Sequence, residues 1–133
     1  MLMNPAVRRA MRSVRLGLAA SVVALPALAG PLNILYNYGN PAGCRNLASG
    51  DYSDDSMFYL TPERFSSYVT SCEILQALRP KNDSYVVTTV CGHEGEATLT
   101  IEMYRIQKTE DGADAWEIYA DNGDLWQRVE PCL

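Results

Sequence analysis

The stretch YVVTTVC at residues 85–91 decides the fold, because β-branched and aromatic side chains dominate it and polar turn residues bound it on both sides. The turns lie at residues 81–84 and 92–95. The next segment, ATLTIEMYRIQK at 97–108, alternates apolar and polar side chains, as a strand with one buried face does. The two stretches therefore predict neighbouring antiparallel strands joined by a short turn.

Further strand patterns precede this pair. Residues 57–60 (MFYL) form a short apolar run that ends at a turn containing Pro62. Residues 65–78 alternate at first, although their second half also fits a helical turn. We interpret 65–78 as mostly strand.

Two hairpin signals follow the pair. Asp-Gly at 111–112 and Asn-Gly at 122–123 are typical of tight turns between antiparallel strands. Apolar and polar side chains alternate at 116–120, between the two turns, and 124–129 is expected to be the last strand. The chain therefore predicts a mainly β fold, an antiparallel meander of five to six strands that forms a small barrel or a curled sheet.

The alternation also predicts a core and a bulge. Within 97–108 the apolar set moves from Leu99, Ile101 and Met103 to Tyr104 and Ile106, and such a phase shift suggests a β-bulge. We expect these residues in the core: Phe58, Leu60, Val87, Leu99, Ile101, Trp116, Ile118 and Trp126.

The first 29 residues have the three parts of a cleavable signal peptide. The first 15 positions contain four arginines and no acidic residue. An uncharged run, LGLAASVVALPALA, covers 16–29 and ends in Ala27-Leu28-Ala29, the small-residue cleavage pattern. A transmembrane anchor is the alternative, but it needs about 20 apolar residues. We expect 1–29 to be removed, 30–55 to form an irregular lead-in, and 56–133 to form a disulfide-stapled β domain.

Cleavage changes the charge. The whole chain has 11 Lys and Arg residues, 16 Asp and Glu residues and a net charge of −5. Four arginines and none of the acids lie in 1–29, so 30–133 keeps seven basic and 16 acidic residues, a net charge of −9. Such a field disfavours nucleic acid and anionic membrane surfaces and favours a cationic partner, although acidity also keeps a protein soluble.

Four cysteines, Cys44, Cys72, Cys91 and Cys132, lie in the expected mature part. An even number in a small exported domain predicts two disulfides, and the absence of a C-x-x-C pair argues against zinc. Four cysteines allow three pairings, and sequence does not choose among them. We favour Cys44–Cys72 with Cys91–Cys132, because the second would tie the last residues to a central strand.

No catalytic, metal-binding or cofactor-binding motif is present in the sequence, and we expect none of these sites. His93 is the single histidine and lies beside Glu94 and Glu96, which we interpret as an exposed hairpin turn rather than a metal or acid–base cluster. The acidic stretches at 111–114 and 121–124 lack the spacing of a calcium loop and fit turns.

One surface is a candidate for interaction. Asp51, Asp54 and Asp55 form the densest acidic patch, and tyrosines, which are enriched at interfaces, crowd the same half of the chain. A solvated loop and ordinary strand packing are the alternative explanations. The candidate interaction surface comprises Asp51, Tyr52, Asp54, Asp55, Tyr36 and Tyr38.

Several short motifs carry a resemblance: Cys44, LTPERF at 60–65, SCE at 71–73, CGHEGE at 91–96 and Cys132. With these the chain resembles small exported alphaproteobacterial proteins of unassigned function, a Cys-stapled β domain. The resemblance implies a periplasmic location and pairing of the first two and the last two cysteines. In size, acidity and disulfides the chain is also similar to periplasmic inhibitors of C-type lysozyme.

These observations predict a non-catalytic periplasmic or secreted protein whose acidic surface binds a cationic protein or an envelope component. Inhibition of lysozyme is the concrete form of this hypothesis. We expect no nucleic acid partner and no stable membrane insertion after signal cleavage. A carrier that holds a small hydrophobic ligand in a β-barrel cavity is the alternative, and an envelope enzyme is the second alternative.

Overall fold

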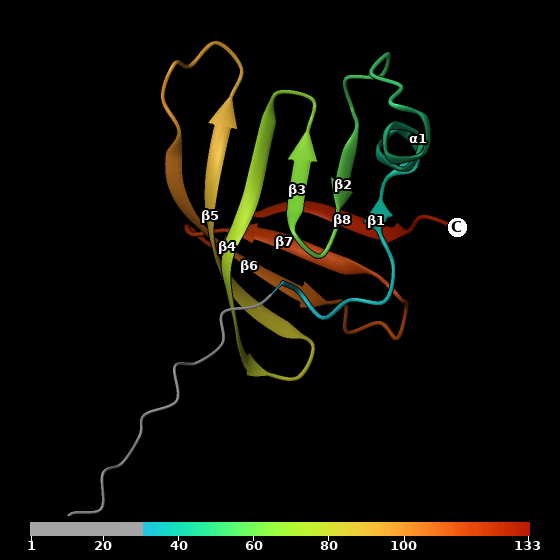
Figure 1. Cartoon of the computed structure of the whole chain (residues 1–133). Helices are drawn as coiled ribbons and strands as arrows, with labels where there is room; N and C mark the ends of the chain where they lie inside the picture. Colours follow the sequence, from blue (N-terminus) through green and yellow to red (C-terminus); the bar gives the residue numbers. More distant parts are fainter. Residues whose placement is uncertain (1–30) are drawn as a thin grey trace, which may run out of the picture.

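The computed structural model describes residues 31–133, so the expected signal peptide at 1–29 lies outside the described residues. Figure 1 shows a strongly curled antiparallel sheet flanked by one short helix. The elements are β1 Tyr38–Gly39, α1 Pro41–Ser49, β2 Phe58–Leu60, β3 Arg64–Ser67, β4 Thr70–Lys81, β5 Ser84–His93, β6 Thr100–Lys108, β7 Trp116–Ala120 and β8 Leu125–Pro131.

Each strand pairs antiparallel with the next in sequence, and β8 pairs with β1 to close a barrel. The predicted mainly β antiparallel meander is therefore confirmed, and of its two expected forms the structure has the barrel. The expected five to six strands are too few for the eight observed within 31–133. The segment 65–78 is divided by a turn at Tyr68 and Val69 into β3 and β4, and the two-residue β1 is too short to give a pattern.

The disulfides are Cys44–Cys132 and Cys72–Cys91, so the favoured pairing is wrong. Cys72 and Cys91 lie directly opposite each other in the β4–β5 ladder. Closure of the barrel brings the end of β8 beside β1 and α1, where Cys132 meets Cys44. The pairing follows from topology that no local pattern encodes.

Helix α1 corrects the expectation of an irregular lead-in at 30–55. Asn40 is its N-cap and accepts a hydrogen bond from the Gly43 amide at 2.7 Å, Pro41 occupies the first turn, and Gly50 ends the helix with φ +74°. The helix packs closely on β2, because a Cβ on Gly43 would meet the Phe58 carbonyl oxygen at 1.8 Å.

The barrel interior is filled by aromatic and aliphatic side chains. The rings of Tyr104 and Trp126 stack with centroids 5.6 Å apart, and the ring of Phe65 packs edge-on against both, at 4.9 Å and 5.8 Å. Buried as predicted are Phe58, Leu60, Val87, Trp116 and Ile118, with the partly buried Trp126 packed against them.

Leu99 and Ile101 were predicted in the core, and this is wrong: they are 71% and 66% exposed. The expected bulge in this segment is also wrong, because β6 pairs with β5 in continuous register and the register shifts lie in the β4–β5 and β7–β8 pairs. In the first half of β6 the half-buried positions are Thr100, Glu102 and Tyr104. These polar side chains face the lumen of the barrel, and the apolar side chains that alternate with them, Ile101 and Met103, therefore face outward.

Candidate functional site

Three connections meet at one end of the barrel: residues 50–57 between α1 and β2, 68–69 between β3 and β4, and 94–99 between β5 and β6 (Figure 1). These connections contain five carboxylates and no lysine or arginine. We call this surface the acidic end and define it by Asp51, Tyr52, Asp54, Asp55, Tyr68, Val69, Glu94 and Glu96.

Two of the three aspartates of the acidic end are held by hydrogen bonds from their own loop. Asp51 accepts a hydrogen bond from the Ser53 amide at 3.0 Å, and Asp54 accepts one from the Ser56 amide at 2.9 Å. These serine hydrogen bonds hold the pKa of Asp51 and the pKa of Asp54 below the ordinary value, and both carboxylates therefore stay charged in mild acid. Arg45 of α1 lies 3.4 Å from Asp54, an exposed pair whose attraction water and salt screen.

An exposed pair of aromatic side chains lies at the acidic end. The rings of Tyr52 and Tyr68 have centroids 5.4 Å apart and are 52% and 39% exposed, and Val69 beside them is exposed. A hollow of about 520 Å³ is lined by Tyr68 and Asp55, and one of about 250 Å³ is lined by both tyrosines and Glu94. An apolar ridge with carboxylates on two sides suits the aliphatic stem and the charged head of lysine or arginine.

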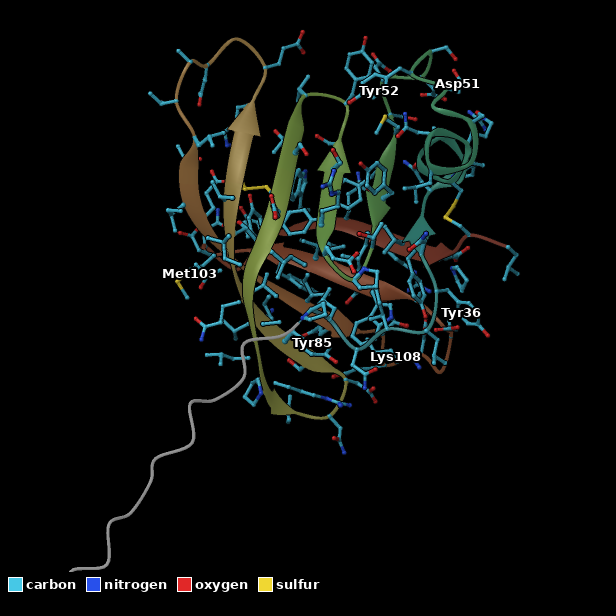
Figure 2. All side chains as sticks on the ribbon, viewed as in Figure 1. Tyr36, Asp51, Tyr52, Tyr85, Met103 and Lys108 are labelled. Carbon is cyan, nitrogen blue, oxygen red and sulfur yellow. A yellow bond between two sulfur atoms is a disulfide. The ribbon has the colours of Figure 1, made fainter. Side chains whose placement is uncertain are left out.

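The structure divides the predicted interaction surface. Asp51, Tyr52, Asp54 and Asp55 lie together in the 50–57 connection. Tyr36 lies well away from Asp51 and Tyr52 (Figure 2).

Tyr38 is 2% exposed and donates a hydrogen bond to Asp114 at 2.9 Å, so its prediction as a surface residue is wrong. It is a packing residue of β1 and lies edge-on against Trp116.

Sequence reasoning missed four members of the site: Tyr68, Val69, Glu94 and Glu96. Tyr68 and Val69 lie inside a segment interpreted as continuous strand, and their exposure follows only from the turn between β3 and β4. Glu94 was seen only as a neighbour of His93.

His93 is part of a polar network, and its interpretation as an exposed turn is wrong. It ends β5, and its Nδ1 lies 2.9 Å from the Thr70 hydroxyl while its Nε2 lies 3.1 Å from Glu102. Tyr104 donates to the other oxygen of Glu102 at 3.0 Å. Burial, and then this bond to Glu102, raises the pKa of Tyr104 above its ordinary value.

A hydroxyl, an imidazole and a carboxylate in this order also occur in hydrolases, where they activate a nucleophile. Here Thr70 is buried, and its hydroxyl faces His93 inside the barrel end. The network satisfies its own members and connects β4, β5 and β6 beneath the acidic end.

Within residues 31–133 one group of side chains has the spacing of a metal site. Ligand atoms of Cys72, Cys91 and Glu102 lie within 4.8 Å of one another. Both sulfurs are joined in a disulfide, and zinc requires thiolates. The oxidised protein therefore has no thiolate to offer a metal here.

Comparison of this chain with protein-family models, with curated proteins and with solved structures finds no match. Two disulfides are typical of proteins that fold in an oxidising, extracytoplasmic environment. Among residues 31–133, no helix has the length and the apolar character needed to cross a membrane.

Proposed function

We propose that the protein is a non-catalytic binding protein of the periplasm or the extracellular space, and that it binds a cationic protein through its acidic end. Inhibition of a basic enzyme such as lysozyme is the concrete form of the proposal. The observation that carries it is the exposed Tyr52–Tyr68 pair at an end of the barrel whose connections contain five carboxylates and no lysine or arginine.

The two kinds of side chain would contribute differently. The carboxylates, on a domain with a net charge of −9, would accelerate encounter with a cationic partner and repel anionic ones. The tyrosines would carry the short-range affinity, because large aromatic side chains at the centre of an interface dominate its binding energy. The rigid barrel and the serine-capped loop would keep both in place before binding.

The test measures binding and inhibition of a C-type lysozyme at low and at high salt. We expect binding at low salt that weakens steeply as salt rises, because exposed charges are screened. Absence of binding at low salt would reject lysozyme as the partner and, with it, the concrete form of the proposal.

Variants locate the interaction. The triple change Asp51→Asn, Asp54→Asn and Asp55→Asn should weaken binding, and asparagine keeps the oxygen that accepts the serine amides. A charge-matched control removes three exposed acids elsewhere: Glu63→Gln, Glu110→Gln and Glu130→Gln. Equal loss in both triple variants would show that net charge, and not the acidic end, drives the binding.

A further inference from the structure

The first half of β6 is an open strand edge of the barrel. The β5–β6 ladder extends to Cys91↔Thr100, whereas the β6–β7 ladder ends at Tyr104↔Ala120. Residues 100–103 therefore have a neighbouring strand on the β5 side alone. Beyond Ala120 the chain leaves the sheet through the turn at 121–124.

The direction of the peptide groups follows from the bonds at the other end of β6. The Lys108 amide donates towards β5, to Asp83, and the Thr109 amide donates towards β7, to Ala115. Successive residues in a strand alternate between the two sides, and β6 has no register shift. The peptide groups of Ile101 and the amide of Met103 therefore point towards the side where β7 has ended.

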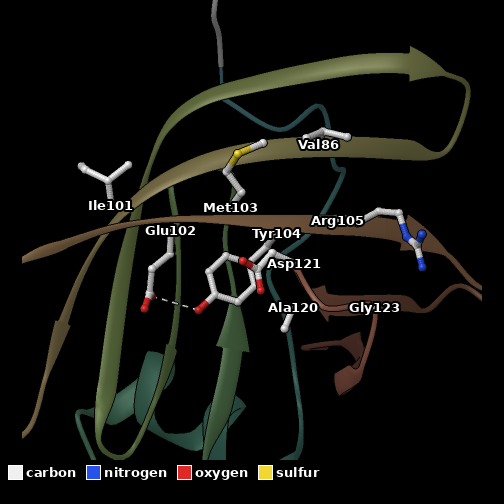
Figure 3. Close-up of a pocket in the computed structure, with 9 residues that line it drawn as sticks. All are labelled: Val86, Ile101, Glu102, Met103, Tyr104, Arg105, Ala120, Asp121 and Gly123. Atoms are coloured by element: carbon white, nitrogen blue, oxygen red, sulfur yellow. Dashed lines mark hydrogen bonds between the residues drawn. The ribbon is translucent and has the colours of Figure 1, made fainter.

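A groove of about 650 Å³ lies along this edge (Figure 3). Ile101 and Met103 project from one face of β6, and Glu102 and Tyr104 project from the other (Figure 3). Ile101 is 66% exposed and Met103 53% exposed. Exposed strand edges flanked by apolar side chains are the surfaces to which extended peptides add as a further strand.

The charges around the groove favour a basic occupant. Asp121 lines it from the β7–β8 turn and is exposed, and Glu102 lines it from β6. Arg105, the basic residue in the lining, lies 4.5 Å over the ring of Tyr119. A second copy of this chain would bring another net charge of −9 to an acidic groove, which disfavours self-pairing.

We propose that the open edge of β6 accepts an extended segment of a partner protein as an added strand, with an apolar–basic–apolar pattern. The two apolar side chains pack beside Ile101 and Met103, and the basic side chain between them lies against Glu102 and Asp121. Four edge residues admit a segment of about three to four residues, because strands advance about 3.3 Å per residue. This site lies outside the acidic end and does not depend on the function proposed for it.

The test uses two synthetic peptides, Thr-Val-Lys-Val-Thr and its counterpart with glutamate in place of lysine, both with blocked ends. Amide resonances of the isotope-labelled protein are followed during titration. We expect the lysine peptide to shift the amides of Ile101 and Met103 more than those of Val87 and Thr89, which are fully buried and paired on both sides of β5. The glutamate peptide should bind more weakly.

Variants separate strand addition from simple apolar contact. Met103→Pro removes the amide that points into the groove. It should lower the affinity for the lysine peptide by about fivefold, the loss expected for one main-chain hydrogen bond. Met103→Ala keeps the amide and should lower the affinity less than the proline change does. Asp121→Asn, an exposed turn variant that leaves the strands intact, should reduce the preference for lysine over glutamate.

Three results would overturn the proposal. The first is a titration with either peptide that leaves the Ile101 and Met103 amides unshifted. The second is an equal affinity of Met103→Pro and Met103→Ala for the lysine peptide. The third is a dimer, measured by sedimentation, that Met103→Pro abolishes, because the occupant of the edge would then be a second copy of this chain.

Discussion

The two disulfides should stabilise the fold unequally, because they close loops of different length. Cys44–Cys132 spans 88 residues and Cys72–Cys91 spans 19. In the chain-entropy model these spans correspond to about 4.6 and about 3.2 kcal/mol of stability. The difference of about 1.4 kcal/mol is a tenfold ratio in the unfolding equilibrium.

Single-disulfide variants measure each value with little interference from packing. In Cys72→Ala/Cys91→Ala only Cys44–Cys132 remains, and in Cys44→Ala/Cys132→Ala only Cys72–Cys91 remains. Each variant is unfolded in urea with and without a strong reductant, and the change in the free energy of unfolding is compared within the same variant. The oxidised and reduced arms then share every side chain except the remaining pair of sulfurs.

We expect the reductant to lower the free energy of unfolding more in the variant that keeps Cys44–Cys132 than in the one that keeps Cys72–Cys91, by about 1.4 kcal/mol. Oxidised single-disulfide variants should also contain no free thiol. A reductant effect that is absent, or larger in the variant that keeps Cys72–Cys91, would refute the reasoning from loop length. Peptide mapping that finds Cys44 joined to Cys72 would refute the barrel closure on which it rests.

Three further changes test the packing and the electrostatics. Phe65→Ala should lower the free energy of unfolding by about 3–5 kcal/mol, whereas Leu99→Ala, at an exposed position on the same barrel, should stay within about 0.5 kcal/mol. Gly43→Ala should lower the melting temperature strongly, because the added methyl group would overlap the Phe58 backbone. The pKa of Asp111 is lowered from 3.8 to about 2 in the folded protein. Its ionised form therefore stabilises the fold above pH 4, and this contribution is lost as the pH falls towards 2. A resonance titration that gives an ordinary pKa for Asp111 would contradict this.

The lowered pKa of Asp111 has a local cause. Hydrogen bonding to Thr109 contributes first, then the bond from the Ala113 amide at 3.0 Å, then Arg128 at 2.9 Å. All these groups favour the charged carboxylate. The turn that follows β6 is therefore held by its own polar groups and by Arg128 of β8.

The strands were predictable because their sequences alternate and their turns contain glycine. Residues 85–91 became the central strand β5, and the Asp-Gly and Asn-Gly turns bound β7 as expected. The face of β6 that points into the barrel was not predictable, because the apolar side chains of Leu99, just before the strand, and of Ile101 predicted burial, and both are exposed. The polar network of His93 and Glu102 occupies the lumen there, and its partners come from other strands.

Helix α1 carried a signal that was overlooked. Asn40 followed by Pro41, with Gly50 nine residues later, is typical of a helix with an N-cap, a proline in its first turn and a glycine at its end. The high content of Gly, Asn and Pro in 30–55 concealed these positions. Half of the candidate site was similarly hidden, because Tyr68 and Glu94 reach it from connections distant in sequence.

Hydrogen exchange of the protein with and without a C-type lysozyme at low salt tests the central claim most directly. We predict that lysozyme protects the three connections of the acidic end, at 50–57, 68–69 and 94–99, and leaves exchange at 109–114 unchanged. Protection confined to other segments, or the same exchange in both samples, would contradict the proposal that the acidic end is the binding surface.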